Sequence, residues 1–200
     1  DVVDGDFPNP WKYFDIAEVR IADQPVIITR TGFSNELGWE LYLRPENDCE
    51  LVGNKIWESG QKYKMMLCGT PAFRARRIEA GLLSAGADFN ETTTPYDVGL
   101  GRFVDLEKAQ FLGKEFLKNA DKTNKLWGLK VKNGIAKKGN LFSITGKILG
   151  KITSSTWSPY LECGVGIVRV NNKFAGAGTP VRVEGIDGKE YSGELCTLPM

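Results

Sequence analysis

The residues best suited to chemistry lie in segment 31–43, where a glycine-rich turn leads into an alternating run with Glu40 at its centre. Successive side chains of a strand point to opposite faces, so Glu40 and Tyr42 share one face. A charge in the middle of a strand is costly unless it meets hydrogen-bond donors. Glu40 is therefore predicted to be paired internally or directed at a ligand. The opposite, core-facing set is predicted to be Trp39, Leu41 and Leu43.

Residue types exclude several kinds of catalytic site. The chain contains no histidine, which excludes Ser-His and Cys-His nucleophile pairs within it. Its cysteines occur singly, without the paired spacing of a zinc or iron–sulfur site, so we predict no metal site and expect these side chains to be buried. Acid–base chemistry must then use carboxylates, lysine, tyrosine or water. The cysteines are Cys49, Cys68, Cys163 and Cys196.

The composition is that of an ordinary globular chain, long enough for one large domain or two small ones. The net charge of +1 offers no basic field for nucleic acid or an anionic membrane, so the expected partners are small molecules or proteins. No segment approaches the roughly 18 consecutive apolar residues of a membrane span, and a cytoplasmic location is expected. Because the chain starts without a methionine, we expect it to be part of a longer sequence.

The N-terminal half has the pattern of an antiparallel sheet covered by helices. Segments 16–21 and 26–31 alternate on either side of the turn-like segment 22–25, which predicts a hairpin, and the strand with Glu40 follows. Apolar residues then recur at helical spacing over residues 45–60, with Pro45 as the expected first helical residue. The predicted fold class is therefore α+β.

A second helix is predicted to begin at Thr70-Pro71 and to run to Leu82, since a hydroxyl N-cap followed by proline is a common helix start. Several arginines crowd this helix, and we expect them to lie on a solvated or ion-paired surface, with anion binding as the alternative. These arginines are Arg74, Arg76 and Arg77.

After the polar segment 119–124 the pattern changes to short strands separated by turns, which predicts a small all-β barrel. We place a domain boundary near Lys122, so that residues 1–121 form the first region and residues 122–200 the second. Scattered tryptophans usually pack in a core, and Trp57, Trp127 and Trp157 are expected there. The predicted strands are 126–132, 147–154, 164–170 and 180–184.

Several segments occur in the order found in one known family. They are Thr31-Gly32-Phe33-Ser34-Asn35-Glu36-Leu37-Gly38-Trp39-Glu40-Leu41, Arg77-Ile78-Glu79-Ala80-Gly81-Leu82, Gly86-x-Asp88, Thr94-Pro95, Gly99-Leu100, Phe111-Leu112-Gly113-Lys114-Glu115, and Gly150-Lys151-Ile152-Thr153-Ser154-Ser155-x-x-Ser158-Pro159. In these motifs the chain resembles the C-terminal part of the glycine cleavage system T-protein family, the aminomethyltransferases. A single such match is weak, whereas the ordered set is specific.

The resemblance implies a tetrahydrofolate site. Glu40 stands at the family's folate-anchoring glutamate, and a carboxylate can accept two parallel hydrogen bonds from the donors along a pterin edge. The alternative is a structural ion pair between Glu40 and Arg30. Phe33 replaces the family's tyrosine, so its ring is expected either to pack against folate or to fill the core.

Two functional positions of the family are not matched. An arginine at the start of the family's second helix aligns with Phe73, and helical geometry turns Arg74 and Arg77 away from that position. The family's aspartate that assists transfer is expected upstream of Asp1, so no catalytic residue is assigned in this chain.

The implied activity is transfer of a one-carbon unit, aminomethyl or methyl, to tetrahydrofolate from a small donor or from a carrier protein that bears it. Three alternatives stay open. They are a demethylase of a small methylated donor such as dimethylsulfoniopropionate, the folate-binding module of a dimethylglycine or sarcosine dehydrogenase-type enzyme, and a non-catalytic folate-binding protein.

Overall fold

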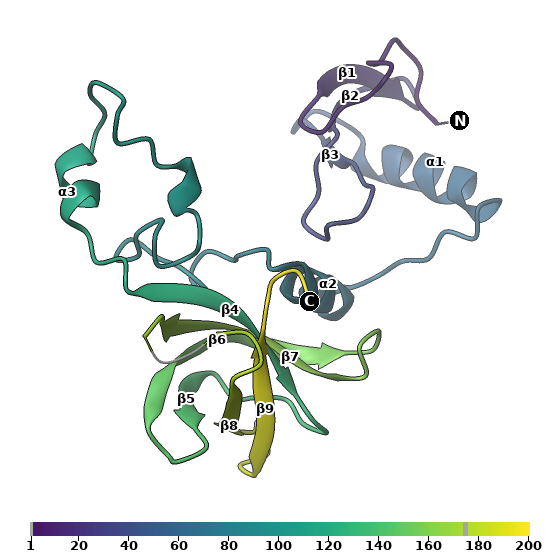
Figure 1. The fold of residues 1–200 in the computed structure, drawn as a ribbon. Helices are drawn as coiled ribbons and strands as arrows, with labels where there is room; N and C mark the ends of the chain where they lie inside the picture. Colours follow the sequence, from purple (N-terminus) through teal and green to yellow (C-terminus); the bar gives the residue numbers. More distant parts are fainter. Residues whose placement is uncertain (1, 174–175) are drawn as a thin grey trace. The chain divides into compact units, whose positions relative to one another are not determined.

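The computed structural model describes residues 2–173 and 176–200, and the chain divides into two compact units, Asp1–Thr70 and Pro71–Met200. The first unit contains a three-stranded antiparallel sheet and a helix, and the second contains a closed six-stranded barrel with helical segments before it (Figure 1). This architecture confirms the predicted α+β class with an all-β barrel. The domain boundary near Lys122 stays a prediction.

The sheet of the first unit starts with the predicted hairpin. Strand β1 (Ile16–Ile21) pairs with β2 (Gln24–Thr29), and β3 (Glu40–Tyr42) pairs with β2. The turn is shorter than predicted and consists of Ala22 and Asp23, whose φ angles of 49° and 60° suit a two-residue hairpin turn of type I′.

Helix α1 (Cys49–Gln61) covers one face of this sheet. The prediction that it begins at Pro45 is wrong. The Asp48 side chain accepts a hydrogen bond from the backbone N–H of Leu51 at 2.9 Å, so Asp48 is the N-cap. The buried residues that join the helix to the sheet are Val19, Ile21, Val26, Ile28 and Val52.

The apolar side chains of the Glu40 segment are not buried as predicted. Trp39 is 44% exposed and Leu41 39% exposed, and Leu43 is also exposed. The buried cluster of this unit is built on β1, β2 and α1, and β3 is a three-residue edge strand beyond it. Trp39 instead packs edge-on against Trp11, with 6.1 Å between ring centroids.

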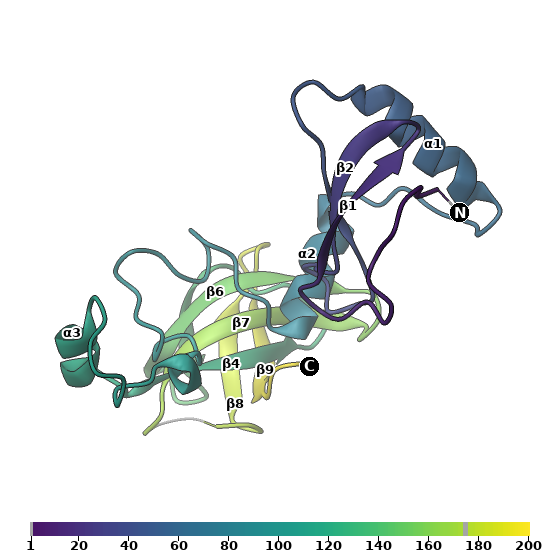
Figure 2. The same cartoon turned by 90° about the horizontal axis from the view of Figure 1, so that it is seen from above.

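The barrel closes in the strand order β4-β7-β6-β5-β8-β9 (Figures 1 and 2). The four predicted strands are confirmed. The strand at 180–184 has the predicted bounds, the one predicted at 147–154 extends to residue 158, and β5 and β9 were not predicted. The strands are β4 (Asn124–Val131), β5 (Gly139–Ser143), β6 (Ile148–Ser158), β7 (Cys163–Asn171), β8 (Pro180–Glu184) and β9 (Glu190–Cys196).

The barrel core consists mainly of aliphatic side chains, and Trp127 packs against it as expected. Trp57 and Trp157 are exposed, so their assignment to the core was wrong. Before the barrel come a 3-10 turn, η1 (Gly101–Phe103), and helix α3 (Lys114–Asn119), and α3 lies away from the barrel strands in both views (Figures 1 and 2).

Helix α2 (Thr70–Ala80) begins where the sequence predicts and ends two residues early. Gly81 adopts a φ of +75°, which favours glycine, and stops the helix. The N–H of Leu82 donates to the carbonyl of Arg77 at 2.8 Å and that of Gly81 to Ile78 at 3.1 Å, the pair of bonds that defines a Schellman C-cap.

The Asp88 carboxylate, which is fully buried, links α2 to the barrel. Arg77 of α2 donates to its Oδ2 at 2.8 Å, and Thr153 and Ser154 of β6 each donate to its Oδ1 at 2.6 Å. The backbone N–H of Ser84 adds a fourth bond at 2.9 Å. Arg77 is therefore buried and ion-paired, whereas a surface position was expected.

Glu79 makes a second connection between α2 and the barrel. Its Oε1 accepts a hydrogen bond from the Ser158 hydroxyl at 2.6 Å, and its Oε2 is paired with Arg76. The Glu79 carbonyl also accepts from the backbone N–H of Met200 at 2.8 Å. Together, Glu79 and Asp88 fix one side of α2 to β6 and to the C-terminal segment.

We predict that Asp88→Ala destabilises the protein by about 3–5 kcal/mol, because the buried Arg77 guanidinium would lose its counter-charge. Urea denaturation followed by fluorescence measures the change.

The matched control is Glu184→Ala, which removes the exposed ion pair between Lys137 and Glu184. We expect this control to change the stability by less than about 1 kcal/mol. Equal effects of the two substitutions would show that the Asp88 network does not hold the unit together.

Candidate functional site

Glu40 lies on the open face of the sheet in the first unit. It is opposite Thr29 in the register of β2 and β3, and the neighbouring residue of β2, Ile28, points into the core under α1. Because side chains alternate, Thr29 and Glu40 lie on the face away from that helix. Tyr42 shares this face with Glu40, as the sequence predicts.

Hydroxyl groups hold one oxygen of the Glu40 carboxylate. The Thr31 hydroxyl donates to Oε2, and the Tyr42 hydroxyl donates to the same oxygen over 3.4 Å. Thr29 and Thr31 are also hydrogen-bonded, with 2.5 Å between their hydroxyl oxygens. Within the described part of the chain, Oε1 accepts no hydrogen bond. Glu40 is half-buried, so solvent reaches part of this residue.

The alternative in which Arg30 pairs with Glu40 is wrong. The Arg30 guanidinium donates to the backbone carbonyl of Gly38 at 3.1 Å and lies over the Trp39 ring at 5.4 Å from its centroid. Arg30 thus fixes the turn before β3, and Glu40 is held by neutral donors.

Phe33 lies in the bend between β2 and β3 and is half-buried. A cavity of about 340 Å³ opens beside this bend in the first unit. Contact of Phe33 with a ligand stays a prediction, as does ligand binding by Glu40. The residues that line the cavity are Tyr13, Arg30, Gly32, Asn35, Glu36 and Leu37.

The arginines of α2 have different surroundings. Arg77 is committed to Asp88 and also donates to the Ser154 hydroxyl at 2.8 Å, so it cannot stand in for the arginine that the family has at position 73. Phe73 and Arg74 are exposed on the same helix.

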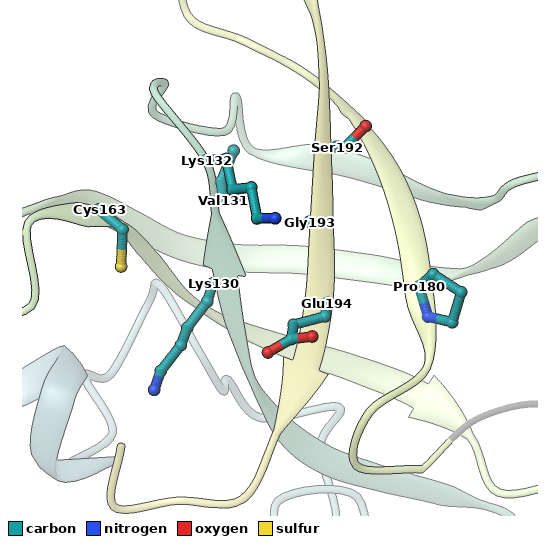
Figure 3. Close-up of a pocket in the computed structure, with 8 residues that line it drawn as sticks. All are labelled: Lys130, Val131, Lys132, Cys163, Pro180, Ser192, Gly193 and Glu194. Atoms are coloured by element: carbon teal, nitrogen blue, oxygen red, sulfur yellow. The ribbon is translucent and has the colours of Figure 1, made fainter.

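A larger cavity, of about 510 Å³, lies on the barrel (Figure 3). Lys130 of β4 and Glu194 of β9 are register partners and line it together with Cys163. Burial raises the pKa of the Cys163 thiol above its usual range, against a smaller opposing effect of Lys130. At neutral pH less of this thiol is in the thiolate form that reacts as a nucleophile.

The cysteines differ in exposure, which corrects their uniform assignment to the core. Cys49 and Cys68 are exposed, whereas Cys163 and Cys196 are half-buried. No group of three or more His, Cys, Asp or Glu side chains that could hold a metal ion occurs in residues 2–173 and 176–200. None of the helices in these ranges is long and apolar enough to cross a membrane.

The sequence points to Glu40 but not to the hydroxyl groups around it. The signal for them was present, since Thr29 and Thr31 are two residues apart and must share a face in an extended segment. Glu40 could not be identified as their partner without the pairing of β2 and β3. The segment between these strands is an irregular turn, so its length does not indicate which residues face each other.

The fold and the Glu40 face define an α+β protein with an open, carboxylate-bearing sheet and a C-terminal barrel. Residues 2–108 match the family model of the GCVT N-terminal domain, and residues 124–200 match that of the glycine cleavage T-protein C-terminal barrel domain. The chain belongs to the glycine cleavage T-protein family.

Individual relatives agree with this assignment. An aminomethyltransferase of a Nostoc species is 34% identical over 96% of this chain and 50% of its own length. The trimethylamine-oxide aldolase of Ruegeria pomeroyi is 33% identical over 89% of this chain and 23% of its own length. The crystal structure of the glycine cleavage system aminomethyltransferase T of Bartonella henselae superposes with a TM-score of 0.81 at 27% identity, over 96% of this chain and 53% of that one. The chain thus spans about half the length of the aminomethyltransferases that it matches.

We predict that Cys163 and Cys196 react with iodoacetamide several-fold more slowly than Cys49 and Cys68 at neutral pH. Burial raises the pKa of both half-buried thiols, so at neutral pH a smaller fraction of each is thiolate than for a thiol of ordinary pKa. Peptide mapping by mass spectrometry after timed labelling measures the four rates. Equal rates at neutral pH would contradict the burial of Cys163 and Cys196.

Proposed function

We propose that this chain is the folate-binding part of a tetrahydrofolate-dependent one-carbon transferase. The observation that carries the proposal is the state of the Glu40 carboxylate on the open face of β3. Its Oε2 is held by the Thr31 and Tyr42 hydroxyls, and its Oε1 accepts no hydrogen bond from the described residues. A half-buried carboxylate that is oriented but not saturated is suited to accept hydrogen bonds from a ligand.

The chemistry of this site fits a pterin. The edge of a pterin ring carries amino and ring N–H donors, and a carboxylate oxygen offers the complementary acceptor. Phe33, in the bend that precedes β3, would supply an aromatic surface for the ring. Glu40 and Phe33 are therefore the residues of this chain that we assign to folate binding.

The protein's part in the reaction is mainly binding and orientation. Bound tetrahydrofolate would supply the nitrogen lone pair that receives the one-carbon unit, so no protein nucleophile is needed. Glu40 would orient the pterin, and a well-oriented acceptor accounts for much of the rate of a two-substrate transfer. The aspartate that assists transfer in the family is not assigned to any residue of this chain, which spans about half the length of the aminomethyltransferases that it matches.

The donor is proposed to be a small molecule that carries an aminomethyl or methyl group, either free or attached to a carrier protein. Similarity to aminomethyltransferases over nearly the whole chain favours the aminomethyl group. A second candidate is a folate module within a larger enzyme that acts on a small methylated amine. The relative that supports it is the trimethylamine-oxide aldolase, of which this chain matches only 23%.

We predict that Glu40→Ala lowers the affinity for tetrahydrofolate about ten- to a hundredfold, because the ligand donors would lose a charged acceptor. Isothermal titration calorimetry of the 200-residue chain measures the affinity, and circular dichroism checks that the variant is folded.

The matched control is Glu18→Ala. Glu18 is a glutamate on β1 of the same sheet, and it pairs with Arg44 at the surface. This control should bind tetrahydrofolate as the unmodified chain does. Unchanged binding by a folded Glu40→Ala variant would rule out Glu40 as the folate anchor.

A further inference from the structure

The hydrogen bonds around Glu40 have a single consistent direction. A carboxylate accepts only, so the Thr31 hydroxyl must use its one proton to donate to Glu40. The bond between Thr29 and Thr31 must then run from the Thr29 hydroxyl to the Thr31 oxygen. The result is a directed chain, Thr29 to Thr31 to Glu40, in which each donor polarises the next.

This chain acts on one carboxylate oxygen. Each carboxylate oxygen has two lone pairs, and those of Oε2 are occupied by Thr31 and, over a longer 3.4 Å contact, by Tyr42. A glutamate side chain on an edge strand otherwise has several rotamers of similar energy. The bond to Thr31 selects among them and leaves Oε1 as the acceptor that faces a ligand.

We propose that Thr31, supported by Thr29, is a positioning residue that sets the orientation of Glu40 for ligand binding. The proposal rests on the folate-binding function inferred above. It names the residue that fixes the Glu40 carboxylate before a ligand binds. Thr31 does not itself touch the ligand. It holds Oε2 so that a donor-bearing ring meets a fixed Oε1, and this preorganisation raises affinity because the side chain need not be ordered on binding.

The variant that tests the proposal is Thr31→Val, which keeps the shape of the side chain and removes the hydroxyl. Titration with tetrahydrofolate should show an affinity about tenfold lower than that of the unmodified chain. Thr31→Ser restores a hydroxyl at the same position and should bind within about twofold of the unmodified chain.

A double-mutant cycle separates positioning from a general structural effect. In a Glu40→Ala background Thr31 has no acceptor at residue 40, so adding Thr31→Val should change the affinity by less than about twofold. Ser34→Ala is the matched control for hydroxyl removal, because Ser34 lies in the same bend and interacts with the Glu36 backbone rather than with Glu40. It should leave the affinity unchanged.

A crystal structure of ligand-free Thr31→Val provides a test that does not depend on folate. The Glu40 carboxylate should leave its position beside residue 31 and adopt another rotamer or several. An unchanged Glu40 rotamer would overturn the positioning role, whatever the binding results are.

The remaining outcomes separate the two proposals. Weaker binding by Glu40→Ala together with full affinity in Thr31→Val would overturn the role of Thr31 and leave the folate site in place. Binding that is insensitive to Glu40→Ala would instead contradict the proposed folate site, and the crystal structure would still decide whether Thr31 orients Glu40.

Discussion

The requirement that a buried carboxylate be fully hydrogen-bonded organises the second unit. Asp88 is removed from solvent, and an ionised carboxylate in such a place is stable only if donors surround it. Its four donors come from α2, from the segment after that helix and from β6. Because all three segments must meet at Asp88, this side chain is one of the polar contacts that fix α2 on the barrel, together with the bond between Glu79 and Ser158. Ile78, which is also fully buried, packs against the barrel at this contact and adds apolar area.

The motifs that identify the family divide into two physical roles. One group is structural, since its polar side chains satisfy each other inside the second unit. The Glu40 segment is different, because its carboxylate is half-buried and bonded on one oxygen only. A saturated carboxylate has no capacity left for a ligand, whereas a partly saturated one does. The structural group consists of Arg77, Glu79, Asp88, Thr153, Ser154 and Ser158.

The spacing of apolar residues predicted those strands and helices in which apolar side chains occupy the buried face. Strand β8 was predicted with the bounds that it has, and the hairpin and both longer helices were found. Strand β9 was missed because polar residues interrupt its apolar positions, and β5 because it begins with Gly139 and Asn140, residue types that are typical of turns. The exposure of Trp39 could not be predicted, since alternation identifies a face of a strand but not whether another element covers that face. For the same reason the sequence identified Glu40 as a candidate site residue and could not identify what holds it.

The nature of the donors to Glu40 decides what the proposed folate site can bind. Had Arg30 paired with Glu40, the two charges would have cancelled and the carboxylate would have kept little attraction for a further donor. Arg30 is instead committed to the Gly38 carbonyl and the Trp39 ring. The Thr31 hydroxyl orients Oε2 without neutralising it, so the negative charge remains available at Oε1. Neutral donors therefore combine a fixed geometry with an undiminished preference for an N–H-rich ligand, a combination that an ion pair does not allow.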